Sequence, residues 1–109
     1  MEEYRDLEDE LTHTHPEFKV SVKCDCGHVF DSKIYYGGVV AGEERQMGAE
    51  KAHVWNNEME CTECGEGLTV ECALYEYPEG TMNHVDFNGN SNCTVLNESE
   101  IIKKLGFKS

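Results

Sequence analysis

Apolar and polar residues alternate along two stretches of this chain, 18–24 and 68–77. A period of two places the apolar side chains on one face of an extended strand, so both stretches are predicted to be half-buried β-strands. The predicted inner face of the second stretch consists of Leu68, Val70, Cys72 and Leu74. Shorter apolar runs predict further strands at 28–36, 54–61, 84–87 and 93–96.

Glycines predict where several of these strands end. Gly37-Gly38 is expected to end the strand at 28–36. Asn88-Gly89 is the dipeptide most typical of a tight hairpin, so the last two strands are expected to pair with each other. Residues 42–53 fit either a flexible loop or a short helix that Gly48 weakens.

A short helix is predicted near each end of the chain. Tyr4, Leu7 and Leu11 recur at helical spacing among acidic residues, which predicts an amphipathic helix at 3–11 that either docks on the rest of the chain or stays mobile. Asn97 followed by Glu100 resembles a capping box and predicts a helix that ends at Gly106. The 109 residues are therefore expected to form an acidic N-terminal arm (1–17) and one mostly β domain of antiparallel hairpins (18–109).

Two short cysteine pairs stand where predicted strands turn. They are Cys24-Asp25-Cys26-Gly27 and Cys61-Thr62-Glu63-Cys64-Gly65. Two turns that each donate two thiolates are the simplest way to surround a soft divalent ion with four sulfurs. The glycine after each pair permits a positive φ, which turns the following amides toward the sulfurs. The alternative for these residues is a pair of disulfides or a set of buried thiols.

The N-terminus bears on that alternative. Residues 1–6 are acidic and contain no apolar secretion segment, so we expect a cytoplasmic protein, in the host cytoplasm if it is viral. A reducing compartment favours a bound metal over disulfides. No apolar stretch approaches the roughly 20 residues of a membrane span, so no membrane partner is expected.

The two cysteine motifs resemble the knuckles of zinc-ribbon proteins, over about ten residues. The resemblance implies a structural Zn²⁺ between β-hairpin tips, held by Cys24, Cys26, Cys61 and Cys64, and a small zinc-ribbon-like domain. It does not name a function, because zinc ribbons serve many. His28 is an alternative ligand in place of one thiolate. Cys72 lies outside both motifs and is predicted to be a small buried apolar residue.

The charge of the chain is strongly acidic. There are 22 acidic and nine basic residues, a formal charge of −13, and no lysine or arginine lies between Lys51 and Lys103. Proteins that grip nucleic acid neutralise phosphates with basic side chains, so direct nucleic-acid binding is not expected. We predict instead that the acids near the second cysteine pair bind a basic protein partner. They are Glu58, Glu60, Glu63, Glu66, Glu71, Glu76 and Glu79. The alternative is that these acids only keep the chain soluble.

These observations predict a non-catalytic, zinc-stabilised module that binds a basic protein surface. In a sharper version the acids imitate nucleic-acid phosphates, as in small acidic inhibitors from phages and mobile elements, which the chain resembles in size and charge only. The alternative is a zinc-ribbon subunit of a nucleic-acid-processing machine or a small metal-dependent enzyme. His15 and Glu17 with the second cysteine pair superficially resemble a nucleobase-deaminase set, but no proline precedes Cys61 and four thiolates close the zinc site.

Overall fold

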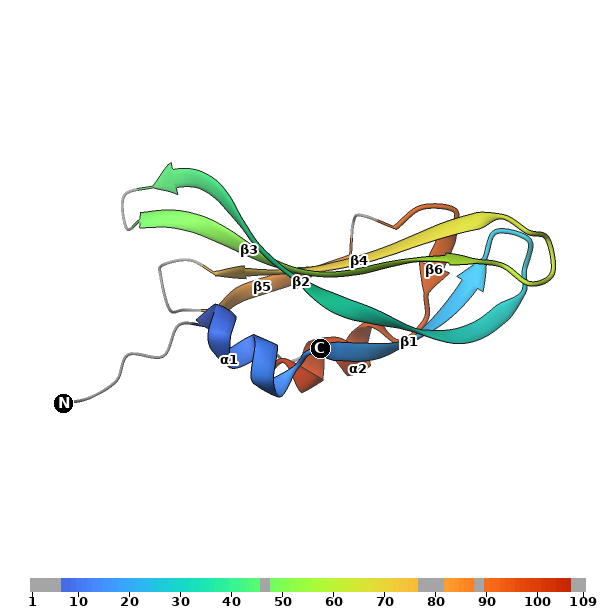
Figure 1. Cartoon of the computed structure of the whole chain (residues 1–109), viewed down its shortest axis with the longest axis horizontal. Helices are drawn as coiled ribbons and strands as arrows, with labels where there is room; N and C mark the ends of the chain where they lie inside the picture. Colours follow the sequence, from blue (N-terminus) through green and yellow to red (C-terminus); the bar gives the residue numbers. More distant parts are fainter. Residues whose placement is uncertain (1–6, 46–47, 77–81, 88–89, 107–109) are drawn as a thin grey trace.

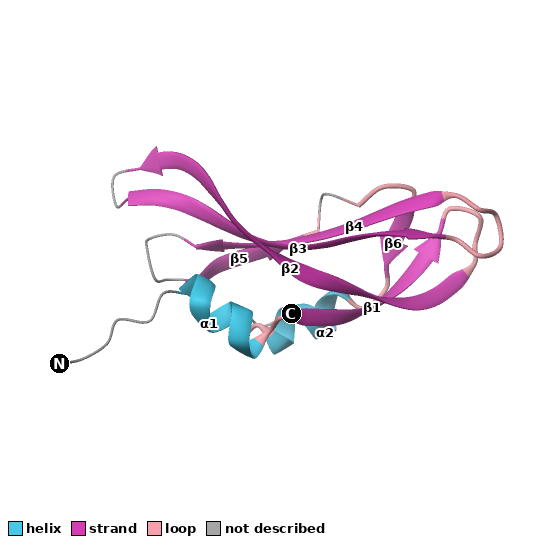
Figure 2. Cartoon of the chain, in the orientation of Figure 1, coloured by secondary structure: helices cyan, strands magenta, loops and turns pink. Residues whose placement is uncertain are grey.

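The computed structural model describes residues 7–45, 48–76, 82–87 and 90–106, with the backbone alone at 7–9, 41–45 and 48–50. The described elements are α1 (Leu7–Thr14), β1 (Glu17–Cys24), β2 (Val29–Arg45), β3 (Gly48–Glu60), β4 (Gly67–Glu76), β5 (Met82–Asp86), β6 (Cys93–Val95) and α2 (Glu98–Lys104) (Figure 1). The strands form one antiparallel sheet in the order β5-β4-β3-β2-β1-β6, curled into a half-barrel (Figure 2). The predicted mostly β class is confirmed. As far as the described residues go, neither helix is long and apolar enough to cross a membrane.

The alternation predicted for β1 and β4 is confirmed. Phe18, Val20, Val22 and Cys24 of β1 are buried at every second position. The predicted inner face of β4, from Leu68 to Leu74, is at most 1% exposed. These side chains form one apolar core together with Ile34 and Trp55.

The strands β2 and β3 are longer than predicted. Gly37-Gly38 does not end β2, which continues to Arg45, and the segment expected to be a loop or a short helix instead belongs to the ends of β2 and β3. The register shifts between Tyr36 and Gly38, where Gly38 has a φ of +114°. A glycine with positive φ accommodates the extra residue of a β-bulge, so the strand bends without breaking.

The predicted hairpin between the last two strands is wrong. Strand β5 pairs with β4, and β6 pairs with β1, through Val22↔Val95 and Cys24↔Cys93. Asn88 and Gly89, which suggested the hairpin, lie outside the described residues. Burial explains part of the outcome, since pairing with β1 places Val95 in the core, where it is 4% exposed.

Residues 90–95, called the seam below, close the sheet at one end. Thr69 of β4 exchanges two backbone hydrogen bonds with Ser91, with N–O distances of 3.3 and 2.9 Å. The Asn90 side chain accepts a bond from the Glu71 amide. The last three residues of the seam form β6 beside β1, so the seam joins the two strands that carry the cysteine turns at their ends.

Both helices lie along the same side of the sheet (Figures 1 and 2). Leu11 of α1 is buried in the core, and the Trp55 indole donates a hydrogen bond to the His15 carbonyl just after the helix. The described part of the N-terminal segment is therefore docked on the sheet, which was one of the two predicted outcomes. The division of the chain at residue 17 stays a prediction, and Tyr4 lies outside the described residues.

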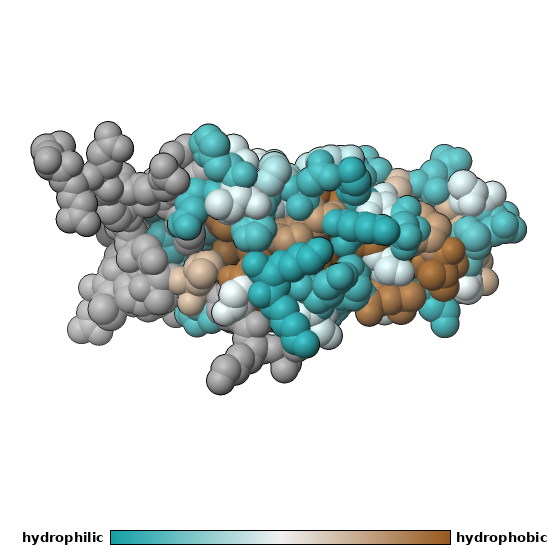
Figure 3. Space-filling model, turned by 90° about the horizontal axis from the view of Figure 1, so that it is seen from below, coloured by the Kyte–Doolittle hydropathy of each residue, from teal (hydrophilic) through white to brown (hydrophobic). Residues whose placement is uncertain are grey.

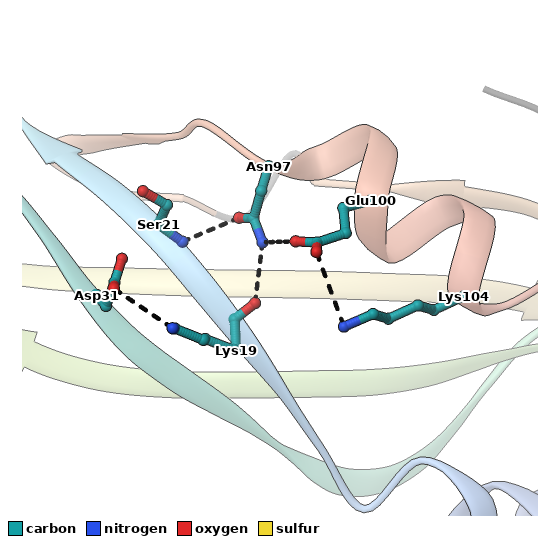
Figure 4. Close-up of polar contacts among 6 residues, drawn as sticks. All are labelled: Lys19, Ser21, Asp31, Asn97, Glu100 and Lys104. Carbon is teal, nitrogen blue, oxygen red and sulfur yellow. Dashed lines mark hydrogen bonds and ion pairs between the residues drawn. The ribbon is translucent and has the colours of Figure 1, made fainter.

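The C-terminal helix α2 is fixed at its start by Asn97. The Asn97 side chain accepts a bond from the Ser21 amide and donates to the Lys19 carbonyl and to Glu100 (Figure 4). It makes no hydrogen bond to the helix backbone, and its bond to Glu100 joins the two side chains, so the N-cap bond of the expected capping box is not formed. Seen from the helix side, polar residues cover much of the surface, with apolar groups showing between them (Figure 3).

Candidate metal centre

The first cysteine turn follows directly from β1. Cys24 is the last residue of that strand, and its amide donates to the His28 carbonyl at 2.9 Å. The Gly27 amide donates back to the Cys24 carbonyl at 2.8 Å, and Gly27 has a φ of +100°. That conformation is strained for any residue with a Cβ, which explains the glycine after the second cysteine.

The second turn, between β3 and β4, repeats this geometry with one more residue. The Cys61 amide donates to the Glu66 carbonyl at 3.0 Å, and the Gly65 amide donates to the Cys61 carbonyl at 2.8 Å. Gly65 has a φ of +73°. Two turns separated by 34 residues of sequence thus take up equivalent conformations at the same end of the sheet (Figure 1).

The four cysteine sulfurs lie together, as the sequence motifs predict. All four are within 4.8 Å of one another, with Sγ–Sγ distances of 3.6 Å for Cys24–Cys64 and 3.7 Å for Cys26–Cys61. A tetrahedral ion with metal–sulfur bonds of about 2.3 Å separates its sulfurs by about 3.8 Å. All four are free thiols, and both short contacts join one turn to the other. The set fits a tetrahedral metal ion after shifts of about 1 Å in the longer separations.

Backbone amides around the sulfurs influence their protonation. Hydrogen bonds from the Cys64 and Glu63 amides lower the pKa of Cys61 to about 7. The Cys26 amide favours the Cys24 thiolate, but burial and hydrogen bonds with the neighbouring thiols outweigh it and raise the pKa of Cys24 to about 12. Several thiolates in so small a space need a cation to balance their charge.

The other cysteines and His28 lie outside this cluster. His28 stacks on Phe30, and its Nε2 is 3.4 Å from the Thr62 hydroxyl, so it links the two turns at their surface. The group of possible metal ligands in the described part of the chain contains four cysteines and no histidine. Cys72 is fully buried, as predicted, and burial raises its pKa to about 12. His15, the histidine of the deaminase-like set, is likewise outside the cluster.

The predicted acidic surface is present in part. Glu58, Glu60, Glu63 and Glu66 are exposed, and Glu71 is half-buried. None of these five carboxylates forms an ion pair with a described lysine. On β1 and β2, in contrast, exposed acids are paired, through Lys19–Asp31 and Lys33–Glu17. Unpaired carboxylates thus gather around the second cysteine turn.

One member of the predicted set is not on that surface, and another lies outside the described residues. Glu76 was expected to be exposed, and this is wrong, because its side chain is 1% exposed and accepts a 2.6 Å contact from His53 Nε2. Glu79 lies outside the described residues. Glu76 sits at an inward-facing position of β4, in step with Leu74 and Cys72, and a partner at hydrogen-bonding distance permits a carboxylate there.

A buried polar network that the sequence did not reveal surrounds Glu76. His53 contacts the Tyr36 hydroxyl through Nδ1 at 2.9 Å and Glu76 through Nε2 at 2.6 Å. The three side chains come from β2, β3 and β4. In the sequence His53 lies in a segment without a readable pattern, so only the observed strand register could have brought these residues together.

Comparison of the chain with protein-family models, with curated proteins and with solved structures finds no match. The resemblance to zinc ribbons therefore rests on the cysteine turns and their geometry alone. Those turns support a metal-binding motif, and the remaining architecture has to be interpreted from its own residues.

Proposed function

We propose that this protein is a non-catalytic, zinc-stabilised module that binds a basic protein surface. The observation that carries the proposal is the four-sulfur cluster, whose shortest separations match the edge of a tetrahedral zinc site. The ligands would be Cys24, Cys26, Cys61 and Cys64. Bound thiolates also suit a reducing compartment such as the cytoplasm.

Four protein ligands argue for a structural ion. A hydrolytic zinc enzyme keeps one coordination position for water, whereas four thiolates fill the tetrahedron. The ion would join the tips of two hairpins whose strands β2 and β3 pair only from Tyr35 and Asn56 onward in the described sheet. Its binding energy would then contribute directly to folding.

The acids around the second turn support a basic partner. Glu58 and Glu60 of β3 are exposed on either side of the half-buried Met59, and Glu63 lies in the turn itself. Unpaired charges of one sign steer an oppositely charged partner and speed its approach. A phosphate backbone would be repelled by the same surface, so the partner is a protein, and the acids imitate the phosphates of a nucleic acid that the partner binds.

The metal part of this proposal is tested by counting bound zinc. Cys64→Ser is expected to lose most of the bound zinc, because it removes one of four ligands. Cys72→Ser is the matched control, since it makes the same chemical change in the core and should keep one zinc per chain. Measured coordination by fewer than four sulfurs with a bound water would contradict a closed structural site and favour an enzyme.

The partner part is tested by reversing the charge of three acids at two different places on the surface. A partner is first captured at low salt and eluted with a salt gradient. Glu58→Lys/Glu60→Lys/Glu63→Lys should slow its association at least about tenfold, because steering by these acids is lost. The control is Glu17→Lys/Asp31→Lys/Glu100→Lys, which has the same net charge and alters other exposed acids. Equal slowing by both variants would show that net charge alone matters and that the acidic surface is not the binding site.

A further inference from the structure

One residue of the seam, Asn92, contacts both cysteine turns. Its carbonyl accepts a hydrogen bond from the Asp25 amide at 3.1 Å, within the first turn. Its side-chain Nδ2 donates to the Gly67 carbonyl at 3.0 Å and to Glu66 Oε1 at 3.3 Å, where the chain leaves the second turn. Asn92 thus bridges the two turns from the side, without offering a metal ligand itself.

The backbone of Asn92 has an unusual conformation. Its φ is +63°, and it is the only described residue other than glycine with a positive φ. Asparagine tolerates this left-handed region better than most residues, and such a conformation persists where surrounding contacts hold it. The contacts that hold Asn92 are those with the two cysteine turns.

The metal and the seam would join the same two parts of the sheet. A metal ion on the four sulfurs connects the end of β1 with the turn that leads into β4. The seam makes the same connection through Ser91, which pairs with Thr69, and through β6, where Cys93 lies opposite Cys24. Once one connection has formed, forming the other costs less conformational entropy. The two connections therefore stabilise each other.

We propose that Asn92 is a positioning residue of the metal centre and that metal binding and closure of the seam are thermodynamically coupled. This inference rests on the metal centre proposed above. Asn92 sets the distance and orientation of the two cysteine turns before the ion arrives. The ion in turn holds the turns so that Asn92 keeps its contacts and Ser91 stays paired with Thr69.

Cobalt(II) binding to the full-length chain tests the first half of the proposal. Asn92→Asp keeps the shape of the side chain and removes the N–H donor, so it should weaken Co²⁺ binding by roughly 10–100-fold, the usual effect of losing a group that supports metal ligands. Asn92→Gly keeps the positive φ without strain but also lacks the amide, so it should not restore binding. Asn57→Asp is the matched control, because it adds the same charge and loses a comparable side-chain bond, to the Lys33 carbonyl.

A spectroscopic readout separates positioning from a general loss of stability. The visible absorption bands of bound Co²⁺ report the geometry of its ligands, so Asn92→Asp should shift them while Asn57→Asp leaves them unchanged. A native affinity and a native spectrum in Asn92→Asp would overturn the assignment and leave the metal centre standing. Failure of the native chain to bind Co²⁺ or Zn²⁺ would overturn the metal centre and this inference together.

Hydrogen exchange on the native chain tests the coupling without any substitution. With metal bound, the Asp25 and Ser91 amides should be protected, since both donate to the bonds of the seam. A chelator should release these two amides to fast exchange before the amides in the middle of β1 and β2. Equal protection of Asp25 and Ser91 with and without metal would show that the seam closes independently of the ion.

Discussion

At the scale of single residues, His53 shows how a side chain gains its role from strand register. It is fully buried, with Tyr36 on one ring nitrogen and Glu76 on the other. A buried carboxylate is stable only when it is hydrogen-bonded or paired. The network therefore ties the middle of β2 and β3 to the end of β4 that lies away from the cysteine turns.

His53→Ala is expected to destabilise the fold by about 3 kcal/mol, because it leaves a cavity and removes the hydrogen bond that His53 makes to a buried carboxylate. His84→Ala is the control. His84 stacks on Tyr75 at the surface of β5, with ring centroids 4.5 Å apart, and its loss should cost less than about 1 kcal/mol. Urea unfolding of the metal-loaded proteins measures both. Equal losses would contradict the importance of the buried network.

At the scale of secondary-structure elements, the sequence predicted best where one face of a strand is buried. The alternation in β1 and β4 could be read directly, because every second side chain enters the core. Gly37-Gly38 led to the wrong prediction that the strand ends there, because the sequence alone does not distinguish a glycine that ends a strand from one that forms a bulge. The Asn88-Gly89 signal was local, whereas the pairing of β6 with β1 depends on a contact with residues some 70 positions earlier.

The same limits apply to the candidate site. Four cysteines could be assigned from their spacing, since each turn is built from adjacent residues with its own glycine. Asn92 could not, because its contacts with Asp25 and Gly67 exist only once three distant segments meet. Alternation also places Glu76 on the inward face of β4, two residues after Leu74. Its charge nevertheless led to the prediction that it is exposed.

The attachment of α2 to the sheet gives a prediction at this scale. Asn97→Ala should destabilise the protein by about 1–2 kcal/mol, because the partly buried Ser21 amide and the Lys19 carbonyl lose their partner (Figure 4). Ser99→Ala in the exposed first turn of α2 should change the stability by less than about 0.5 kcal/mol. Unfolding in urea compares the two. A neutral Asn97→Ala would mean that Ile101 and Leu105 alone hold the helix.

At the scale of the whole molecule, metal removal should affect one end of the sheet most. Each kcal/mol of stabilisation lost with the ion lowers the melting temperature by roughly 4–8 °C in a domain of this size. Metal loss should also follow acidification, because protons compete with the ion for the thiolates and weaken its binding as the pH falls. Thermal melts with and without a chelator, at neutral and mildly acidic pH, measure both effects. A melting temperature that does not respond to the chelator would contradict a structural ion.

The closed seam has a further consequence for how this protein behaves at high concentration. Unpaired strand edges are templates for pairing between molecules, and proteins protect them by keeping edge strands short. The edge strands of the described sheet are β5 and β6, which span five and three residues. The seam shields the edge of the longer β4 at Thr69. Loss of the ion would expose that edge of β4. The metal-free protein is therefore expected to aggregate before it unfolds.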